Sequence, residues 1–153
     1  MKSKLLILCI VITNLVACNN GDDMLLSYQH SLQTGFYSHN TKKDTVLTAI
    51  KAWGIGHEDS LLYDGSQSLH ELFLNLNMNE NRTQFVICTQ MLRDEIDVYY
   101  SHHLQPVSGS GGITMEIRID SIKHTNVFLD SLAIKQRDRK YNESTQNVEI
   151  FVY

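Results

Sequence analysis

The segment that decides the fold reads Ile113-Thr114-Met115-Glu116-Ile117-Arg118-Ile119-Asp120. Four apolar side chains alternate with four polar or charged ones. Because successive side chains of a β-strand point to opposite faces, this alternation indicates a strand with one buried and one solvated face. Strands of a parallel sheet are buried on both faces and read as continuous apolar runs, so we expect antiparallel sheets.

The same alternation recurs along the chain. It is clear in the segments 96–101, 72–79 and 148–153, and no window of a dozen residues shows the 3.6-residue period of a helix. Less regular runs, rich in β-branched and aromatic residues, lie at 32–37, 45–53, 60–63, 83–89, 125–129 and 131–136. About eight to ten short strands predict an all-β fold, an antiparallel β-sandwich that is immunoglobulin-like or related.

Turn residues separate these runs. Asp64-Gly65 predicts a hairpin turn, and the Asn-rich segment 77–82 suits a connection because Asn tolerates left-handed backbone. Ser108-Gly109-Ser110-Gly111-Gly112 predicts a flexible loop before the 113–120 strand, and 25–32 favours a helical turn. We expect a single domain.

The N-terminus carries an export signal. Lys2 and Lys4 precede an apolar run, 5–17, which would span only about 20 Å as a helix, less than a ~30 Å hydrocarbon core. This predicts a secretory signal peptide rather than a membrane-spanning helix. The run ends in Leu15-Val16-Ala17-Cys18, which resembles the lipobox of bacterial lipoproteins.

The lipobox resemblance implies a modified cysteine and a cleaved leader. The Cys18 sulfur would take a diacylglycerol, and the signal peptidase would cut before it. The expected organisation is a signal peptide at 1–17, a lipidated N-terminus and linker at 18–25, and a β-sandwich domain at 26–153. The alternative is an unmodified signal peptide that happens to contain a cysteine.

Composition limits the partners. Cleavage would remove two of the 13 Lys and Arg residues and none of the 17 Asp and Glu, so the net charge of the mature chain would be −6. Nucleic-acid binding depends on basic clusters, so no nucleic-acid partner is expected. Of the three cysteines only Cys88 would remain unmodified, which excludes an intramolecular disulfide.

Several short motifs together resemble an uncharacterised family of Bacteroidetes-type outer-membrane lipoproteins with a single β-rich domain. They are the lipobox, Gly35-Phe36-Tyr37, Val46-Leu47-Thr48, Gly54-Ile55-Gly56, Asp59-Ser60-Leu61-Leu62-Tyr63-Asp64 and Asp97-Val98-Tyr99-Tyr100. The resemblance implies an outer-membrane address, on the periplasmic or the cell-surface face, and assigns no activity.

No motif carries recognisable catalytic or metal chemistry. Adjacent histidines such as His102 and His103 point to opposite faces of a strand and do not chelate together. A cryptic hydrolase would need a pocket that holds His57 or His102 beside a carboxylate and a nucleophile. We expect no catalytic residues, no metal site and no cofactor, and a protein that is not an enzyme.

The expected function is therefore a non-enzymatic binding or accessory module of the cell envelope. Its N-terminal lipid would hold it on the membrane, and its partner would be an envelope protein or a glycan. The alternative is a carbohydrate-binding surface lipoprotein, in which Tyr99 and Trp53 stack against sugar rings. A hydrolase is the least favoured class.

Overall fold

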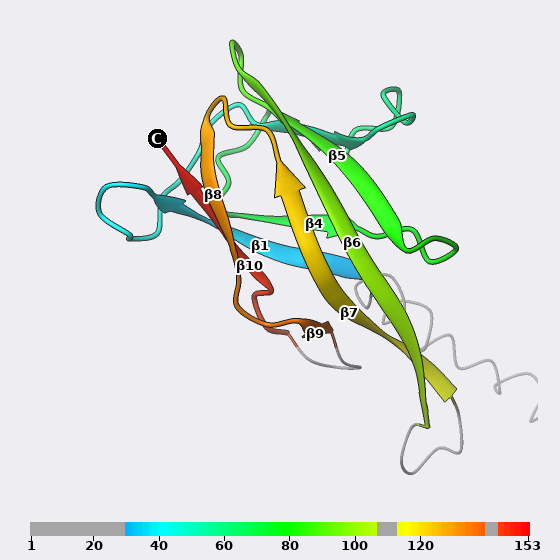
Figure 1. Ribbon diagram of the computed structural model, residues 1–153. Helices are drawn as coiled ribbons and strands as arrows, with labels where there is room; N and C mark the ends of the chain where they lie inside the picture. Colours follow the sequence, from blue (N-terminus) through cyan, green and yellow to red (C-terminus); the bar gives the residue numbers. More distant parts are fainter. Residues whose placement is uncertain (1–29, 107–112, 140–143) are drawn as a thin grey trace, which may run out of the picture.

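The computed structural model describes residues 30–106, 113–139 and 144–153, which form ten strands in two sheets. One sheet has four strands in the order β4-β1-β10-β8, and the other has six in the order β3-β2-β5-β6-β7-β9. Figure 1 shows the long β6–β7 hairpin running obliquely across β1 and β10. The strands are β1 (Ser31–Ser38), β2 (Lys51–Gly54), β3 (Tyr63–Asp64), β4 (Glu71–Asn75), β5 (Arg82–Cys88), β6 (Arg93–Pro106), β7 (Ile113–His124), β8 (Leu129–Ile134), β9 (Asp138–Arg139) and β10 (Val148–Val152).

The predicted all-β antiparallel sandwich is confirmed, with one parallel exception. β1 and β10 run parallel at the centre of the four-stranded sheet, from Thr34 beside Val148 to Ser38 beside Val152. The short strand β9 was not predicted, and β6 and β7 are longer than expected, at 14 and 12 residues. Alternation shows which face of a strand is buried, but it does not show which strand lies next to it.

The Asp64-Gly65 hairpin prediction was wrong in part. A turn does form, because Gly65 has a φ of 85° and Asp64 accepts a hydrogen bond from the Ser66 amide at 2.9 Å. However, β3 pairs with β2 rather than with β4, so the turn joins strands of different sheets. The predicted loop 108–112, the signal peptide and Cys18 lie outside the described residues. The same holds for most of the helical turn predicted at 25–32, but its last two residues, Ser31 and Leu32, belong to strand β1, so the helical prediction is wrong there.

The hydrophobic core lies between the sheets and follows the predicted alternation. The 113–120 segment buries Ile117 and Ile119 while Arg118 and Asp120 stay exposed. The four-stranded sheet contributes Leu32, Phe36, Leu72, Leu74, Val148 and Ile150, and the six-stranded sheet contributes Phe85, Ile87, Ile96, Val98, Tyr100, Ile117 and Ile119. Burial of a large apolar side chain stabilises the fold by about 1.5–3 kcal/mol each before conformational entropy is subtracted.

A buried carboxylate holds the connection between the sheets. Asp94, at the start of β6, is fully buried and accepts hydrogen bonds from the amides of Val127, Phe128 and Leu129 at 2.7–2.9 Å. The Thr125 hydroxyl donates a fourth bond at 2.5 Å. These residues connect β7 of one sheet to β8 of the other, so the Asp94 side chain ties the crossover to the six-stranded sheet.

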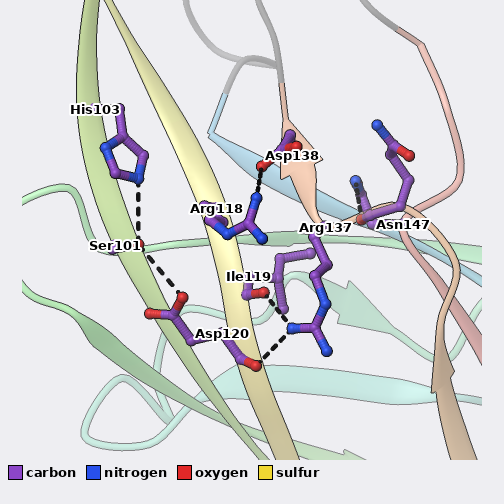
Figure 2. A network of polar contacts seen from close by, with 9 residues as sticks. Ser101, His103, Arg118, Ile119, Asp120, Arg137, Asp138 and Asn147 are labelled. Carbon is purple, nitrogen blue, oxygen red and sulfur yellow. Dashed lines mark hydrogen bonds and ion pairs between the residues drawn. The ribbon is translucent and has the colours of Figure 1, made fainter.

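A buried amide performs a similar task on the opposite side. Asn147 is fully buried, its Oδ1 accepts from the Gln33 amide at 3.2 Å, and its Nδ2 donates to the Gln136 carbonyl at 3.2 Å. Nearby, the Arg137 guanidinium donates to the carbonyls of Ile119 and Asp120 at 2.9 and 2.7 Å (Figure 2). The segment between β8 and β9 is thereby fastened to both sheets.

We predict that Asp94→Ala lowers the free energy of unfolding by about 3 kcal/mol or more, because three amides and one hydroxyl lose their buried acceptor. Urea denaturation followed by circular dichroism measures the loss. Glu95→Gln is the matched control, because Glu95 is the next residue and its side chain forms a surface ion pair with Arg93 at 2.8 Å. Equal losses in the two variants would contradict the role of Asp94.

We also predict an acid-sensitive stability that depends on Asp94. Burial raises the pKa of this carboxyl, but the Thr125 hydroxyl and the three amides outweigh burial and hold the pKa below its ordinary 3.8. A carboxyl with a depressed pKa contributes stability above the unfolded pKa and loses it as the pH falls through the folded pKa. Urea unfolding between about pH 5 and pH 2 should therefore show a steep fall in stability for the wild type and a shallower one for Asp94→Asn. If the unfolding free energy of the wild type and of Asp94→Asn fell equally with pH, Asp94 would not be the source of the acid sensitivity.

Candidate functional site

Tyr99 lies on the outer face of the six-stranded sheet, as predicted for a stacking residue, but its ring is already engaged. The Arg82 guanidinium of β5 and the Lys123 ammonium of β7 lie over the ring, at 5.4 and 5.3 Å from its centroid. The Tyr99 hydroxyl donates to Asp97 Oδ2 at 3.1 Å. Because β5 and β7 flank β6, a sugar that stacked here would have to displace a cation.

The Arg82–Asp97 ion pair organises this cluster. Arg82 Nε and Nη2 donate to the two carboxylate oxygens of Asp97 at 2.7 and 2.6 Å, a bidentate geometry. These bonds hold the pKa of Asp97 below its ordinary value. Arg82 is therefore a neutralised cation rather than a free anion-binding group.

Trp53 lies on the same outer face but does not extend the Tyr99 surface. It pairs with Val86, which pairs with Glu95, four residues before Tyr99 on β6. Four residues of strand span about 13 Å, and one further strand intervenes. Trp53 is half-buried beside the fully buried Val86, and its indole nitrogen has no hydrogen-bond partner among the described residues. The structure thus separates the two predicted stacking residues.

Figure 2 shows a serine between a histidine and a carboxylate on this face. The Ser101 hydroxyl lies 3.5 Å from His103 Nε2 and 3.4 Å from Asp120 Oδ1. A catalytic triad requires the histidine to lie between the nucleophile and the acid. Here the serine occupies the middle position, the contacts are long and exposed, and the Asp120 carboxylate does not orient the imidazole. The row is a chain of surface polar contacts.

One hollow in the described surface is a groove of about 550 Å³. Its walls come from the loop after β2, the residues after β4 and the first half of β5. Polar lining residues include His57, Ser60, Asn75, Asn77, Glu80 and Gln84. Apolar lining residues are Ile55, Leu62, Leu76 and Phe85. The volume falls within the range of known ligand sites, and the lining is richer in polar side chains than most of them.

Local turn chemistry shapes the outer wall of the groove. Gly56 has a φ of 84°, and its amide donates to the Glu58 carboxylate at 3.0 Å. The His57 amide donates to the Gly54 carbonyl, and the Ser60 amide donates to the His57 carbonyl, at 2.9 and 3.0 Å. A Cβ placed on Gly54 would lie 3.7 Å from the His57 imidazole, so the ring lies beside Gly54 at the groove.

A buried phenol fixes the inner wall. The Tyr100 hydroxyl donates to the Asn77 carbonyl at 2.7 Å and bonds the Thr83 hydroxyl at 2.6 Å. Thr83 Oγ1 in turn accepts from the Asn77 amide at 2.9 Å. Burial raises the pKa of Tyr100, so the phenol stays neutral. Asn77 and Thr83 therefore face the groove from a braced loop rather than a free one.

The residues required for a cryptic hydrolase meet only in part. The groove brings together His57, Ser60 and Glu80, but among the described residues no hydrogen bond joins their side chains. His102 instead packs edge-on against Tyr100, with ring centroids 5.4 Å apart. Within the described ranges no group of three or more His, Cys, Asp or Glu side chains could hold a metal ion. Cys88 is a half-buried free thiol.

Sequence reasoning missed the groove. Its residues come from three separate segments, and their convergence depends on strand pairing that alternation does not reveal. The available signals were the Gly54-Ile55-Gly56 turn and the Asn-rich stretch after residue 75. Both predicted loops, but neither predicted that the loops share one hollow.

Comparison with protein families gives a match over most of the chain. Residues 45–152 match the model of a family of unknown function, DUF6452, and the match begins after β1. No curated protein and no solved structure matches the chain. A search of the described residues for a helix long and apolar enough to cross a membrane finds none.

We predict that Tyr100→Phe loosens the inner wall of the groove. The substitution removes a hydroxyl that two groups use, so the free energy of unfolding should fall by about 1–2 kcal/mol. Hydrogen exchange at the Asn77 amide should accelerate as well. Tyr99→Phe is the matched control, because the hydroxyl of that neighbouring tyrosine makes one half-exposed bond and braces no loop. Exchange at Asn77 that is unchanged in Tyr100→Phe would refute the bracing role.

Proposed function

Since the chain belongs to the DUF6452 family of unknown function, its role has to be argued from its own residues, and we propose that it is a lipid-anchored, non-enzymatic binding module of the cell envelope. The outer membrane is its proposed location, on the periplasmic or cell-surface face. The domain would bind a partner in the envelope, either a protein or a glycan.

The observation that carries the anchor is the lipobox Leu15-Val16-Ala17-Cys18 after a basic start and a short apolar run. Acylation of Cys18 with two or three chains would give a stable tether, because each buried CH₂ contributes about 0.8 kcal/mol. The linker 18–25 would separate the domain from the lipid surface.

The observation that supports binding rather than catalysis is the groove. It offers several polar side chains that make no hydrogen bond within the described residues, among them His57 and Ser60, while a paired nucleophile and base are not formed there. A second candidate, carbohydrate binding through Tyr99 and Trp53, is weakened by the two cations over Tyr99.

We predict that Cys18→Ala abolishes incorporation of an alkyne-labelled fatty acid when the full-length chain is expressed in a bacterium that processes lipoproteins. The variant should also move from the membrane pellet to the soluble fraction, because the sulfur that accepts the diacylglycerol is gone. Labelling followed by gel fluorescence, with fractionation of the same cells, measures both effects.

Two matched controls separate lipidation from general cysteine chemistry. Cys9→Ala alters the signal peptide, and Cys88→Ala alters the folded domain, so both should label like the wild type. An unlabelled wild type, or a Cys18→Ala variant that stays on membranes to the same extent, would overturn the proposed anchor.

A further inference from the structure

We propose that the groove binds an uncharged, hydroxyl-rich oligosaccharide, with His57, Ser60 and Glu80 as hydrogen-bonding residues and the apolar floor against the sugar rings. This inference rests on the proposed role as a binding module and names its ligand class. It places the carbohydrate in the groove rather than against the rings of Tyr99 and Trp53.

The groove offers both hydrogen-bond donors and hydrogen-bond acceptors. A sugar hydroxyl both donates and accepts, so it needs partners of both kinds within a short distance. The Ser60 hydroxyl does both, the Glu80 carboxylate accepts, and the imidazole of His57 offers one donor and one acceptor when neutral. The side chains of these three residues make no hydrogen bond within the part of the chain that the structure describes, although all three line the groove.

The charged side chains at the groove favour a neutral ligand. The cation at the groove, Arg82, is bound through two hydrogen bonds to Asp97, which leaves it little capacity for an incoming anion. Glu80 adds a negative charge that would repel phosphate or carboxylate groups. The groove therefore suits a neutral ligand better than an anionic one.

The backbone around the groove does not suit an extended peptide that would add a strand to a sheet. Such binding uses free backbone amides and carbonyls at a sheet edge. Here the Ile55 amide donates to the Gln84 carbonyl and the Leu62 amide donates to the Ala52 carbonyl, at 2.9 and 2.8 Å. The Asn77 amide is taken by Thr83. Side chains, not the backbone, are what the groove presents.

Apolar side chains in the groove suit the faces of sugar rings. Leu76 and Phe85 line the groove but are nearly fully buried, so the apolar surface that a ligand can reach comes mainly from Ile55 and Leu62 on the loop side. Sugar rings present apolar C–H faces between their hydroxyls, and such faces pack on aliphatic and aromatic carbon. A groove that combines this floor with the polar side chains above it matches both surfaces of a sugar.

The test begins with the full-length lipidated chain in detergent, applied to a printed array of neutral and anionic glycans. We expect binding to neutral glycans with little dependence on salt. The best neutral glycan is then titrated by calorimetry. Trp53 is the single tryptophan and adjoins the groove residue Gly54, so its fluorescence gives a second readout.

Variants locate the site. Gly54→Leu should fill the groove and weaken binding at least tenfold, whereas Gly54→Ala should change it less than threefold, because a Cβ there meets its neighbours at ordinary contact distances. Ser60→Tyr, on the exposed loop, obstructs the groove without touching the core and serves if Gly54→Leu does not fold. Tyr99→Ala should leave affinity within about twofold, which separates the groove from the outer sheet face.

The outcomes are decisive in either direction. Binding of neutral glycans that Gly54→Leu or Ser60→Tyr abolishes supports the proposal. No bound glycan, a preference for anionic glycans, or binding lost in Tyr99→Ala and kept in both groove variants overturns it. Failure here would leave fatty-acid labelling of Cys18 unaffected, so the ligand and the anchor are tested separately.

Discussion

The buried carboxylate of Asp94 is the constraint on which the arrangement of the two sheets depends. A carboxylate without partners would be costly at full burial, and here three amides and a hydroxyl supply them. All four donors belong to the segment that leaves β7 and enters β8. The same bonds therefore satisfy the charge and set where the chain passes from the six-stranded sheet to the four-stranded one.

The position of β8 then determines what β10 and β1 can do. β10 pairs with β8 in antiparallel register, and β1 completes the sheet by lying parallel to β10. Asn147 secures this order from the other side, because its backbone and side chain bond Gln33 before β10 begins. Two buried polar side chains at opposite ends of the connection thus specify a topology that apolar packing alone would leave open.

Most of the strands and their buried faces could be predicted from the sequence, because alternation is a local signal. In the 113–120 segment Ile117 and Ile119 are buried, as its pattern indicates. The parallel pairing of β1 with β10 could not be predicted, because the partners are more than a hundred residues apart in the chain. The existence of β9 could not be predicted either, because it pairs with β7, about twenty residues earlier. The role of Asp94 could not be predicted either, because its donors are more than thirty residues away in the chain.

In the candidate site, too, local features could be predicted and contacts between distant residues could not. The outward direction of Tyr99 followed from its place in the β6 alternation, but the cations over its ring depend on the registers of β5 and β7. The β6–β7 register also shifts between Tyr99 and Tyr100, so cross-strand neighbours there cannot be counted from a turn. A pattern can therefore place a side chain on a face and still leave its neighbours unknown.

The groove is shaped by hydrogen bonds that brace the loops around it. Asp94 and Asn147 hold the connections around β8, and between the edge strands β4 and β3 the Phe73 amide donates to the Tyr63 hydroxyl at 2.8 Å. Tyr100 braces the Asn77 loop from the core, and the Gly54–Ser60 turns shape the facing wall. His57, Ser60 and Glu80 line the hollow between them without a side-chain hydrogen bond among the described residues, which leaves these groups available to a ligand.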